Sequence, residues 1–142
     1  MTSVGVFEGV HVDQMYREHL LDHYRNPRHF GTITGADHVH DLNPLCGDEL
    51  EFFAVFDGTM IRQVSFKGQG CALSVASASM LAEEAVGKDG KWVKELSRAS
   101  MNALVGVDVA PMRVKCMMLS VKILKTLVYL HEGKTVDGGL LW

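Results

Sequence analysis

The sequence has few cysteines, few prolines and no long apolar segment. Of its 142 residues only three are cysteine, three proline and two tryptophan. Three cysteines are too few for the disulfide framework that stabilises small secreted domains. No apolar run approaches the roughly 18–20 residues that a membrane-spanning helix requires. The first nineteen residues lack the basic and then apolar build of a secretory signal, so we expect a cytoplasmic protein with no membrane association.

A strong excess of acidic or basic residues is also missing. The formal net charge is only -3, which provides no electrostatic reason to expect nucleic acid as a partner. Hydrophobic residues make up 47% of the chain and charged residues 22%, a balance typical of a folded chain with a buried core. The length fits one domain, and no repeat or low-complexity run suggests a second one.

Hydrophobic periodicity and turn residues predict one helix, about three short strands and then three more helices. The expected segments are a helix from Asp13 to just before Pro27, a loop at 26–38, strands at 38–42, 49–56 and 60–68, and helices at 71–87, 90–106 and 111–131. The turn Asp57-Gly58-Thr59 predicts a hairpin, and imperfect alternation in its second strand predicts a bulge or a twisted edge. This order predicts an α+β fold: a small three-stranded antiparallel sheet packed by helices on one side.

Residues 1–12 and 133–142 lack such periodicity. We expect a flexible amino-terminal tail at 1–12, one domain at 13–132 and a carboxy-terminal tail at 133–142. The helix at 90–106 is expected to turn four apolar residues inward: Trp92, Leu96, Ala99 and Ala103. The last helix is expected to present a narrow solvent-exposed stripe of lysines: Lys115, Lys122 and Lys125.

The three cysteines stand at the ends of predicted elements. Cys46 lies in the loop that enters the hairpin, where Gly47 permits a sharp turn between it and Asp48. Cys71 follows two glycines and opens a helix, whose positive end favours a thiolate. Cys116 lies in the first turns of the last helix. Positions at element ends, unlike positions in the middle, are not typical of cysteines that merely fill a core.

Spacing alone leaves two interpretations open. The sequence has no Cys-x-x-Cys knuckle, so a structural zinc finger is poorly supported. Four ligands from Cys46, Asp48, Cys71 and Cys116 would still satisfy tetrahedral zinc or one face of an iron–sulfur cluster. The alternative is that the thiols are inert and that Asp48 is an ordinary turn residue.

Four segments carry a resemblance to a known family. They are HYRNPRHFG at 23–31, NPLCGDEL at 43–50, FKGQGCALSVASASML at 66–81 and RVKCMMLS at 113–120. Together and in this order they resemble the signature segments of the IscU/SufU/NifU family of iron–sulfur cluster assembly proteins. The likeness covers roughly residues 13–130, most of the chain.

The resemblance implies a ligand set and a function. Family members fold as a three-stranded sheet with helices and gather three cysteines and one aspartate at an exposed tip, which here are Cys46, Asp48, Cys71 and Cys116. Such proteins accept sulfur from a cysteine desulfurase as a persulfide, assemble a [2Fe–2S] cluster and pass it to recipient apo proteins or carrier proteins. They often carry zinc in the same ligands when isolated. The resemblance therefore implies that this chain is a scaffold or sulfur carrier, sulfurtransferase-like at most, and not an enzyme.

Three residues acquire expected roles from this resemblance. Asp48 is an oxygen ligand, which should hold iron or zinc less tightly than a fourth thiolate would. Cys116 is the expected persulfide acceptor, and Lys115 beside it is a candidate auxiliary residue that favours its thiolate.

The chain departs from the family in two ways. IscU-type scaffolds carry a histidine just before the third cysteine, where this chain has Lys115. The Arg-Val-Lys-Cys form resembles the SufU branch, in which tightly held zinc and sulfur transfer dominate, but the extra stretch of that branch is absent between Gly87 and Pro111. A zinc-dependent sulfur-transfer protein that stimulates a desulfurase is therefore the alternative function. The sequence leaves a homodimer open.

Other interpretations assign less to the same residues. A cysteine enzyme with a Cys–His pair gives no role to three cysteines and an aspartate, and a structural zinc module should unfold on chelation. For Arg113, as for Lys115, the sequence leaves two interpretations open: a functional role at the site or a surface salt bridge. The histidines near the signature segments are interpreted as structural or surface groups, not as ligands: His23, His29, His38 and His40.

Overall fold

The structure is a computed structural model that describes residues 5–44, 47–106 and 109–134, with side chains from residue 15 onward. In chain order the elements are α1 (Gly5–Arg25), β1 (Asp37–Asn43), β2 (Asp48–Asp57), β3 (Met60–Gln69), α2 (Ala72–Ala85), α3 (Gly90–Lys94), α4 (Arg98–Val105), the 3₁₀ turn η1 (Pro111–Arg113) and α5 (Val114–His131). In the described part of the chain no helix is long and apolar enough to cross a lipid bilayer.

The three strands form one antiparallel sheet in the order β1-β2-β3. Asp57 pairs with Met60 across a two-residue loop, and Gly58 adopts the positive φ of 64° that such a tight hairpin requires. Along β2, Val55 pairs with Gln63 while the next residue pairs with Ile61. Arg62 is therefore an extra residue in β3, which confirms the bulge predicted for the second hairpin strand.

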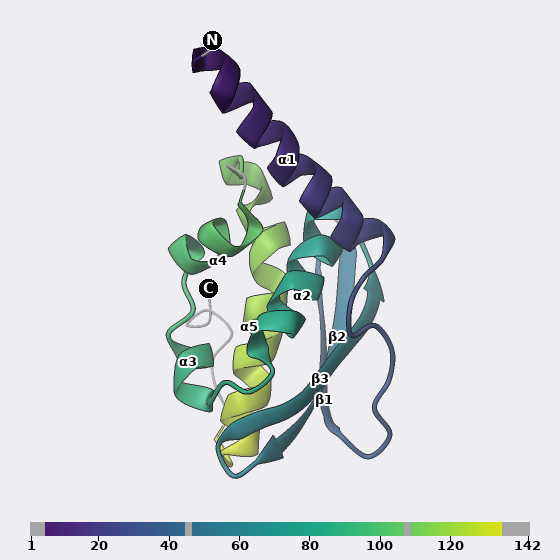
Figure 1. Ribbon diagram of the computed structural model, residues 1–142. Helices are drawn as coiled ribbons and strands as arrows, with labels where there is room; N and C mark the ends of the chain where they lie inside the picture. Colours follow the sequence, from purple (N-terminus) through teal and green to yellow (C-terminus); the bar gives the residue numbers. More distant parts are fainter. Residues whose placement is uncertain (1–4, 45–46, 107–108, 135–142) are drawn as a thin grey trace.

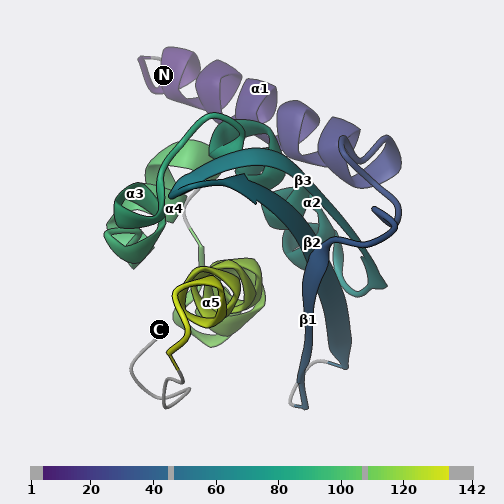
Figure 2. The same cartoon turned by 90° about the horizontal axis from the view of Figure 1, so that it is seen from below.

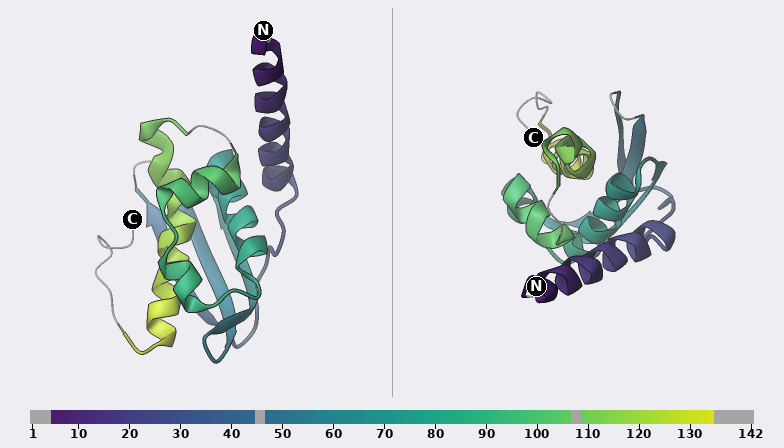
Figure 3. Two further views of the ribbon diagram at one scale, coloured as in Figure 1. Left: turned by 60° about the vertical axis from the view of Figure 1, so that its left-hand side comes forward. Right: turned by 90° about the horizontal axis from the view of Figure 1, so that it is seen from above.

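Helices cover one face of this sheet. α5 packs against β1 and β2, α2 packs against β3, and the two helices contact each other. Figure 2 shows α5 lying in the concave side of the curved sheet, with α1 across the outer side of α2. The amino-terminal part of α1 extends beyond the rest of the molecule (Figures 1 and 3). The predicted α+β fold is confirmed.

The core lies between the sheet and α2 with α5. Its largest fully buried side chains include Phe52, Phe66, Leu81, Leu119 and Leu124, each of which stabilises the fold by about 1.5–3 kcal/mol relative to exposure. α2 is buried nearly all round, because α1 covers the side that the sheet does not. This explains its alanines and serines, since small side chains let helix axes and strands approach closely.

Two predicted helices have different bounds. The first begins at Gly5, not at Asp13, so it includes part of the segment expected as a tail. A helix grows by one hydrogen bond per added residue once it is nucleated, and two glycines do not prevent this. The helix predicted at 90–106 is two helices, because the Ser97 side chain accepts a hydrogen bond from the Ser100 N–H and starts α4 afresh.

The buried set on these helices also differs from the prediction. Ala99 and Ala103 are exposed, and the residues that point into the core are Val93, Leu96, Met101 and Val105. Lys125 is not part of a solvent stripe. It is buried, its Nζ donates a 2.7 Å hydrogen bond to the Leu96 carbonyl, and burial lowers the pKa of its ammonium group. The helical period cannot reveal this, because the α3–α4 corner folds over the polar side of α5.

Candidate metal centre

Three side chains from distant parts of the chain meet at one end of the sheet. Asp48 opens β2, Cys71 precedes α2 and Cys116 lies in the first turn of α5. One ligand atom from each lies within 4.8 Å of the other two. The antiparallel register explains why Asp48 and Cys71 meet. Glu49 pairs with Gln69, so the start of β2 and the end of β3 lie side by side at the same end of the sheet.

Asp48 is fully buried, yet only half of its carboxylate is satisfied. Its Oδ1 accepts a 2.9 Å hydrogen bond from the backbone N–H of Cys71. Its Oδ2 is buried and has no hydrogen-bond partner among the described atoms. A buried acceptor left unpaired costs about 1–3 kcal/mol, and more when it is charged. A cation between this oxygen and the two sulfur atoms would remove that cost, so the residues present fit a thiophilic metal.

Two glycines before Cys71 let the chain pass close to Asp48. A Cβ atom at Gly70 would lie 2.5 Å from Asp48 Oδ1, and one at Gly68 would lie 2.1 Å from the Glu49 carbonyl oxygen. Gly68 also has a φ of 146°, which side chains rarely allow. Glycine at these two positions of the Gly-Gln-Gly-Cys segment allows the close approaches that bring the Cys71 N–H to the Asp48 carboxylate.

Cys71 and Cys116 have different surroundings. Cys71 is partly exposed and caps α2, and its Sγ accepts a hydrogen bond from the Ser74 N–H at 3.4 Å. The positive end of the α2 dipole thus faces this sulfur, as predicted. Cys116 is only 1% exposed, and its Sγ lies 3.9 Å from the Asn43 side-chain amide nitrogen. A partner protein therefore meets Cys71 first in this conformation.

Arg113 is a cation next to the sulfur atoms, which favours the functional role that the sequence left open for it over a surface salt bridge. A hydrogen bond to Cys71, together with the charges of Cys71 and Cys116, raises the pKa of Arg113 above its ordinary value. Arg113 precedes Cys116 by three residues, a spacing that puts two side chains on one side of a helical turn. That spacing was the available signal.

Lys115 lies elsewhere. It is exposed and lines a surface groove of about 420 Å³ together with Arg98, Val114 and Met118. Successive residues of a helix point in different directions, so Lys115 and Cys116 do not share a face. Its auxiliary role next to Cys116 stays a prediction, and Arg113 is placed better for it.

Residues 15–137 match the family model described as NifU-like N terminal domain. The chain belongs to this family. It is 34% identical over 139 residues to the zinc-dependent sulfurtransferase SufU of Bacillus subtilis (strain 168), with 86% of this chain and 95% of the relative covered. It is 31% identical over 133 residues to the iron–sulfur cluster assembly scaffold protein IscU of Streptococcus pyogenes serotype M1, with 80% and 82% covered.

Solved structures share the fold. The crystal structure of FiSufU from Fervidobacterium islandicum AW-1 superposes with a TM-score of 0.68 at 30% identity, and the match covers 81% of this chain and 97% of that one. The N-terminal NifU-like protein of Brucella abortus has a TM-score of 0.71 at 15% identity, with 87% and 99% covered, which shows the fold alone. The NifU-like chain is thus a member of the iron–sulfur cluster assembly scaffold family, and the resemblance found in its four segments is confirmed.

The structure brings together three of the four predicted ligands of this NifU-like domain: Asp48, Cys71 and Cys116. The fourth, Cys46, lies outside the described residues, so its place in the ligand set stays a prediction. Gly47 beside it has a φ of 72°, and its N–H donates to the Asn43 carbonyl at 2.8 Å. The sharp turn expected there is present.

Proposed function

We propose that Cys46, Asp48, Cys71 and Cys116 together bind one metal centre, and that the protein accepts sulfur from a cysteine desulfurase and assembles a [2Fe–2S] cluster for transfer to recipient proteins. The observation that carries the proposal is the meeting of Asp48, Cys71 and Cys116 within 4.8 Å, with one buried Asp48 oxygen free to accept a cation. Family membership supports the same function.

Sulfur acceptance needs an accessible thiolate. The attacking thiolate forms an S–S bond to the outer sulfur of the desulfurase persulfide, the bond between that sulfur and the desulfurase cysteine breaks, and this cysteine leaves as a thiolate. Cys116 is the acceptor expected from the sequence, but it is buried while Cys71 is partly exposed. Sulfur delivered to Cys116 must therefore arrive after a local movement or by way of a neighbouring thiolate.

Arg113 contributes electrostatics to this step. Its guanidinium lies against Cys71 and Cys116, so it stabilises the negative charge of the attacking sulfur. Asp48 contributes the opposite property. A carboxylate oxygen is a poorer ligand than a thiolate for a soft metal centre, so a cluster held partly by Asp48 leaves more readily than one held by four thiolates.

A zinc-dependent sulfur carrier is the second candidate, and two observations favour it. The SufU of Bacillus subtilis, at 34% identity, is named a zinc-dependent sulfurtransferase. Lys115 stands where IscU-type scaffolds have a histidine just before the third cysteine. In this function the same four residues hold zinc, which keeps the thiolates deprotonated and ready for sulfur transfer when bound.

Reconstitution with a cysteine desulfurase, cysteine and ferrous iron under anaerobic conditions separates the two functions. A scaffold gains iron and acid-labile sulfide in equal amounts and absorbs visible light. A sulfur carrier keeps zinc, gains no iron and accelerates cysteine turnover by the desulfurase. A folded protein that gains neither iron with sulfide nor the ability to accelerate the desulfurase would refute both candidates.

The Asp48→Ala variant tests the role of the oxygen ligand within the scaffold function. We expect it to retain a reconstituted cluster and to transfer it to an apo-ferredoxin more slowly than the wild type. Equal transfer rates would show that Asp48 does not govern release. Glu84→Ala, which removes an exposed carboxylate near the far end of α2, serves as the control and should transfer at the wild-type rate.

A further inference from the structure

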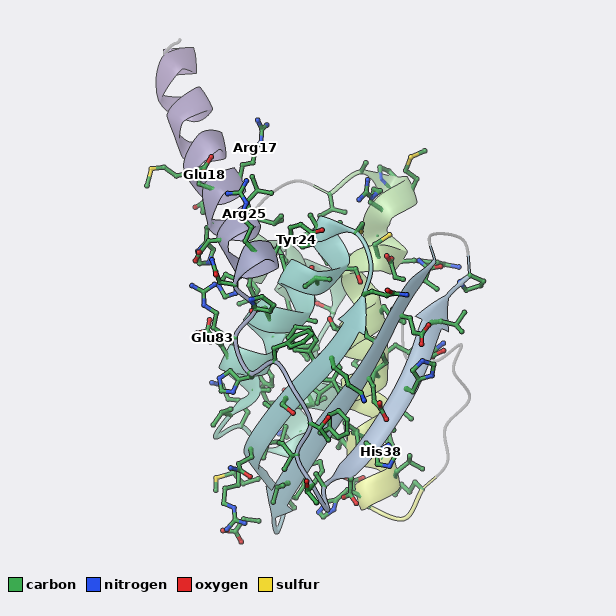
Figure 4. The ribbon with its side chains drawn as sticks, turned by 90° about the vertical axis from the view of Figure 1, so that its right-hand side faces the viewer. Arg17, Glu18, Tyr24, Arg25, His38 and Glu83 are labelled. Atoms are coloured by element: carbon green, nitrogen blue, oxygen red, sulfur yellow. The ribbon has the colours of Figure 1, made fainter. Side chains whose placement is uncertain are left out.

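The sheet face turned away from α2 and α5 carries a second group of metal-ligating side chains. His38 and His40 are two residues apart on β1, and Glu49 and Glu51 are two apart on β2. Because side chains alternate along a strand, and because His40 lies directly opposite Glu51 in the register, all four share one face. Figure 4 shows His38 on this face, with α5 behind the strands.

These side chains already touch in pairs. His38 Nδ1 lies 2.8 Å from Glu51 Oε2, and His40 Nε2 lies 2.9 Å from Glu49 Oε1. His38, His40 and Glu49 are about half exposed, while Glu51 is largely covered. The Glu51 carboxylate thus contacts His38 and lies directly opposite His40 in the strand register.

We propose that His38, His40 and Glu51 form a second divalent-cation site on the open face of the sheet, with Glu49 as an alternative oxygen ligand. Two histidines and a carboxylate suit zinc and ferrous iron. Metal–ligand bonds of about 2.0–2.2 Å at a tetrahedral angle separate neighbouring ligand atoms by about 3.4 Å. The present 2.8 Å contact of His38 with Glu51 needs to open only slightly for a cation to enter.

One side-chain rotation completes the ligand set. In the described part of the chain only the Asp48, Cys71 and Cys116 group has three ligand atoms within 4.8 Å, because His40 turns toward Glu49. Its other neighbour is Glu51, directly opposite, where Cβ atoms are about 4.5–5.5 Å apart. An exposed histidine changes between staggered rotamers at little cost.

The local charge and packing favour a cation. Glu49 and Glu51 carry two negative charges, and Lys67, whose Nζ lies 3.7 Å from Glu51 Oε1, carries one positive charge. The His38 ring is stacked on Phe53 with 5.8 Å between centroids, which holds it over the same face. Entry of a metal displaces the Lys67 ammonium group, whose long side chain is free to turn to solvent.

The second site cannot share ligands with the cysteine centre. Consecutive strand residues point to opposite faces, so Asp48 faces the helices while Glu49 faces the open side. Without thiolates and open to solvent, the second site should bind metal more weakly and exchange it faster. The protein would then hold a loosely bound cation on the same strand as its tightly bound one.

Cobalt(II) and zinc titrations of the full chain test this proposal. The first equivalent should occupy the cysteine centre and give the thiolate-to-cobalt charge-transfer absorption. A second equivalent should bind with a dissociation constant below about 100 µM and add no charge-transfer band. The His38→Ala/His40→Ala double variant should bind the second equivalent at least about tenfold more weakly, with the first equivalent unchanged, and Glu51→Gln should act in the same direction.

The control is His29→Asn, which removes an exposed histidine elsewhere and keeps a residue that tolerates its φ of 56°. It should bind both equivalents as the wild type does. Absence of a second equivalent, or a second equivalent with unchanged affinity in the double variant, would overturn the proposal. Loss of the first equivalent alone would instead count against the proposed function, so the two failures are distinguishable.

Discussion

Two buried polar clusters in this molecule differ in whether their central oxygen atom has hydrogen-bond partners. Between α1 and α2, His23 is 2% exposed, and its Nδ1 lies 2.7 Å from Ser79 Oγ, which also accepts the Arg28 N–H at 2.8 Å. At the end of the sheet, Asp48 is equally buried, but its Oδ2 has no partner among the described atoms. Arg28 Nη1, Ser74 Oγ and Ser77 Oγ are also buried without a partner among the described atoms, but of these atoms only Asp48 Oδ2 is an acidic oxygen grouped with two cysteines. The hydrogen bonds of Ser79 therefore stabilise the fold, whereas the unpaired Asp48 oxygen favours a metal ligand.

The largest effect is expected at the satisfied cluster. Ser79→Ala leaves the His23 nitrogen and the Arg28 N–H without their partner, which should lower the free energy of unfolding by about 2–4 kcal/mol. Thr126→Ala is the matched control, because that hydroxyl bonds only to the Lys122 carbonyl one turn earlier in its own helix. Urea unfolding of both variants measures the difference. A loss below 0.5 kcal/mol, about the control's expected limit, would mean that the cluster does not hold α1 in place.

At the metal centre, Gly70→Ala should act on affinity more than on folding. The added methyl would stand 2.5 Å from Asp48 Oδ1 and must push the carboxylate out of place. We expect zinc affinity to fall about 10–100-fold, as when a group that orients a ligand is removed. Competition with a chromophoric chelator measures it. Gly35→Asn, where a Cβ meets no atom within 4 Å and asparagine tolerates the φ of 81°, should keep the wild-type affinity. An unchanged affinity in Gly70→Ala would contradict the packing argument.

Asp48→Asn tests the effect of the unpaired Asp48 oxygen on the stability of the metal-free protein. The amide oxygen can still accept the Cys71 N–H, and the unpaired buried charge is gone. Stability of the metal-free variant should therefore equal or exceed that of the wild type, within about 1 kcal/mol. The additional stability that zinc confers on the wild type should be lost. Thermal melts with and without chelator check both statements, and a variant that is strongly destabilised without metal would contradict the account.

The smallest expected effect is a pH dependence at the satisfied cluster. Burial lowers the pKa of His23 below its ordinary value, and Arg28 and His19 act in the same direction while Glu83 and Asp22 oppose it. Below about pH 6.5 the His23 side chain therefore binds a proton more readily in the unfolded chain than in the folded chain. The free energy of unfolding should decrease as pH falls through this range. His23→Gln should show a smaller difference in unfolding free energy between pH 7.5 and pH 5.5. An equal difference in both proteins would remove His23 as the cause.

Local pattern was enough to predict the sheet. The hairpin around Gly58, the bulge in β3 and the helical turn that Pro111 opens just before α5 depend on turn residues and alternation within a few positions. The cysteines and Asp48 could be selected because they stand at element ends. The meeting of Asp48, Cys71 and Cys116 within 4.8 Å was expected from the family resemblance, whereas their spacing alone left it open.

What the sequence did not predict depends on contacts between distant elements. Lys125 fits a solvent stripe by its helical period, but the Leu96 carbonyl of the α3–α4 corner accepts its hydrogen bond and buries it. The role of Arg113 stayed open, because its contact with Cys71, 42 positions earlier in the chain, exists only in the folded protein. The break at Ser97 was missed since a serine in a helical pattern is ambiguous until its capping bond is seen.

The ligand set itself is the central claim, and X-ray absorption at the zinc edge of the purified protein tests it most directly. The account predicts three sulfur ligands at about 2.3 Å and one oxygen at about 2.0–2.2 Å, with the oxygen lost in Asp48→Ala and one sulfur lost in each of Cys71→Ser and Cys116→Ser. A first shell of nitrogen and oxygen only, or a shell unchanged in those variants, would contradict it.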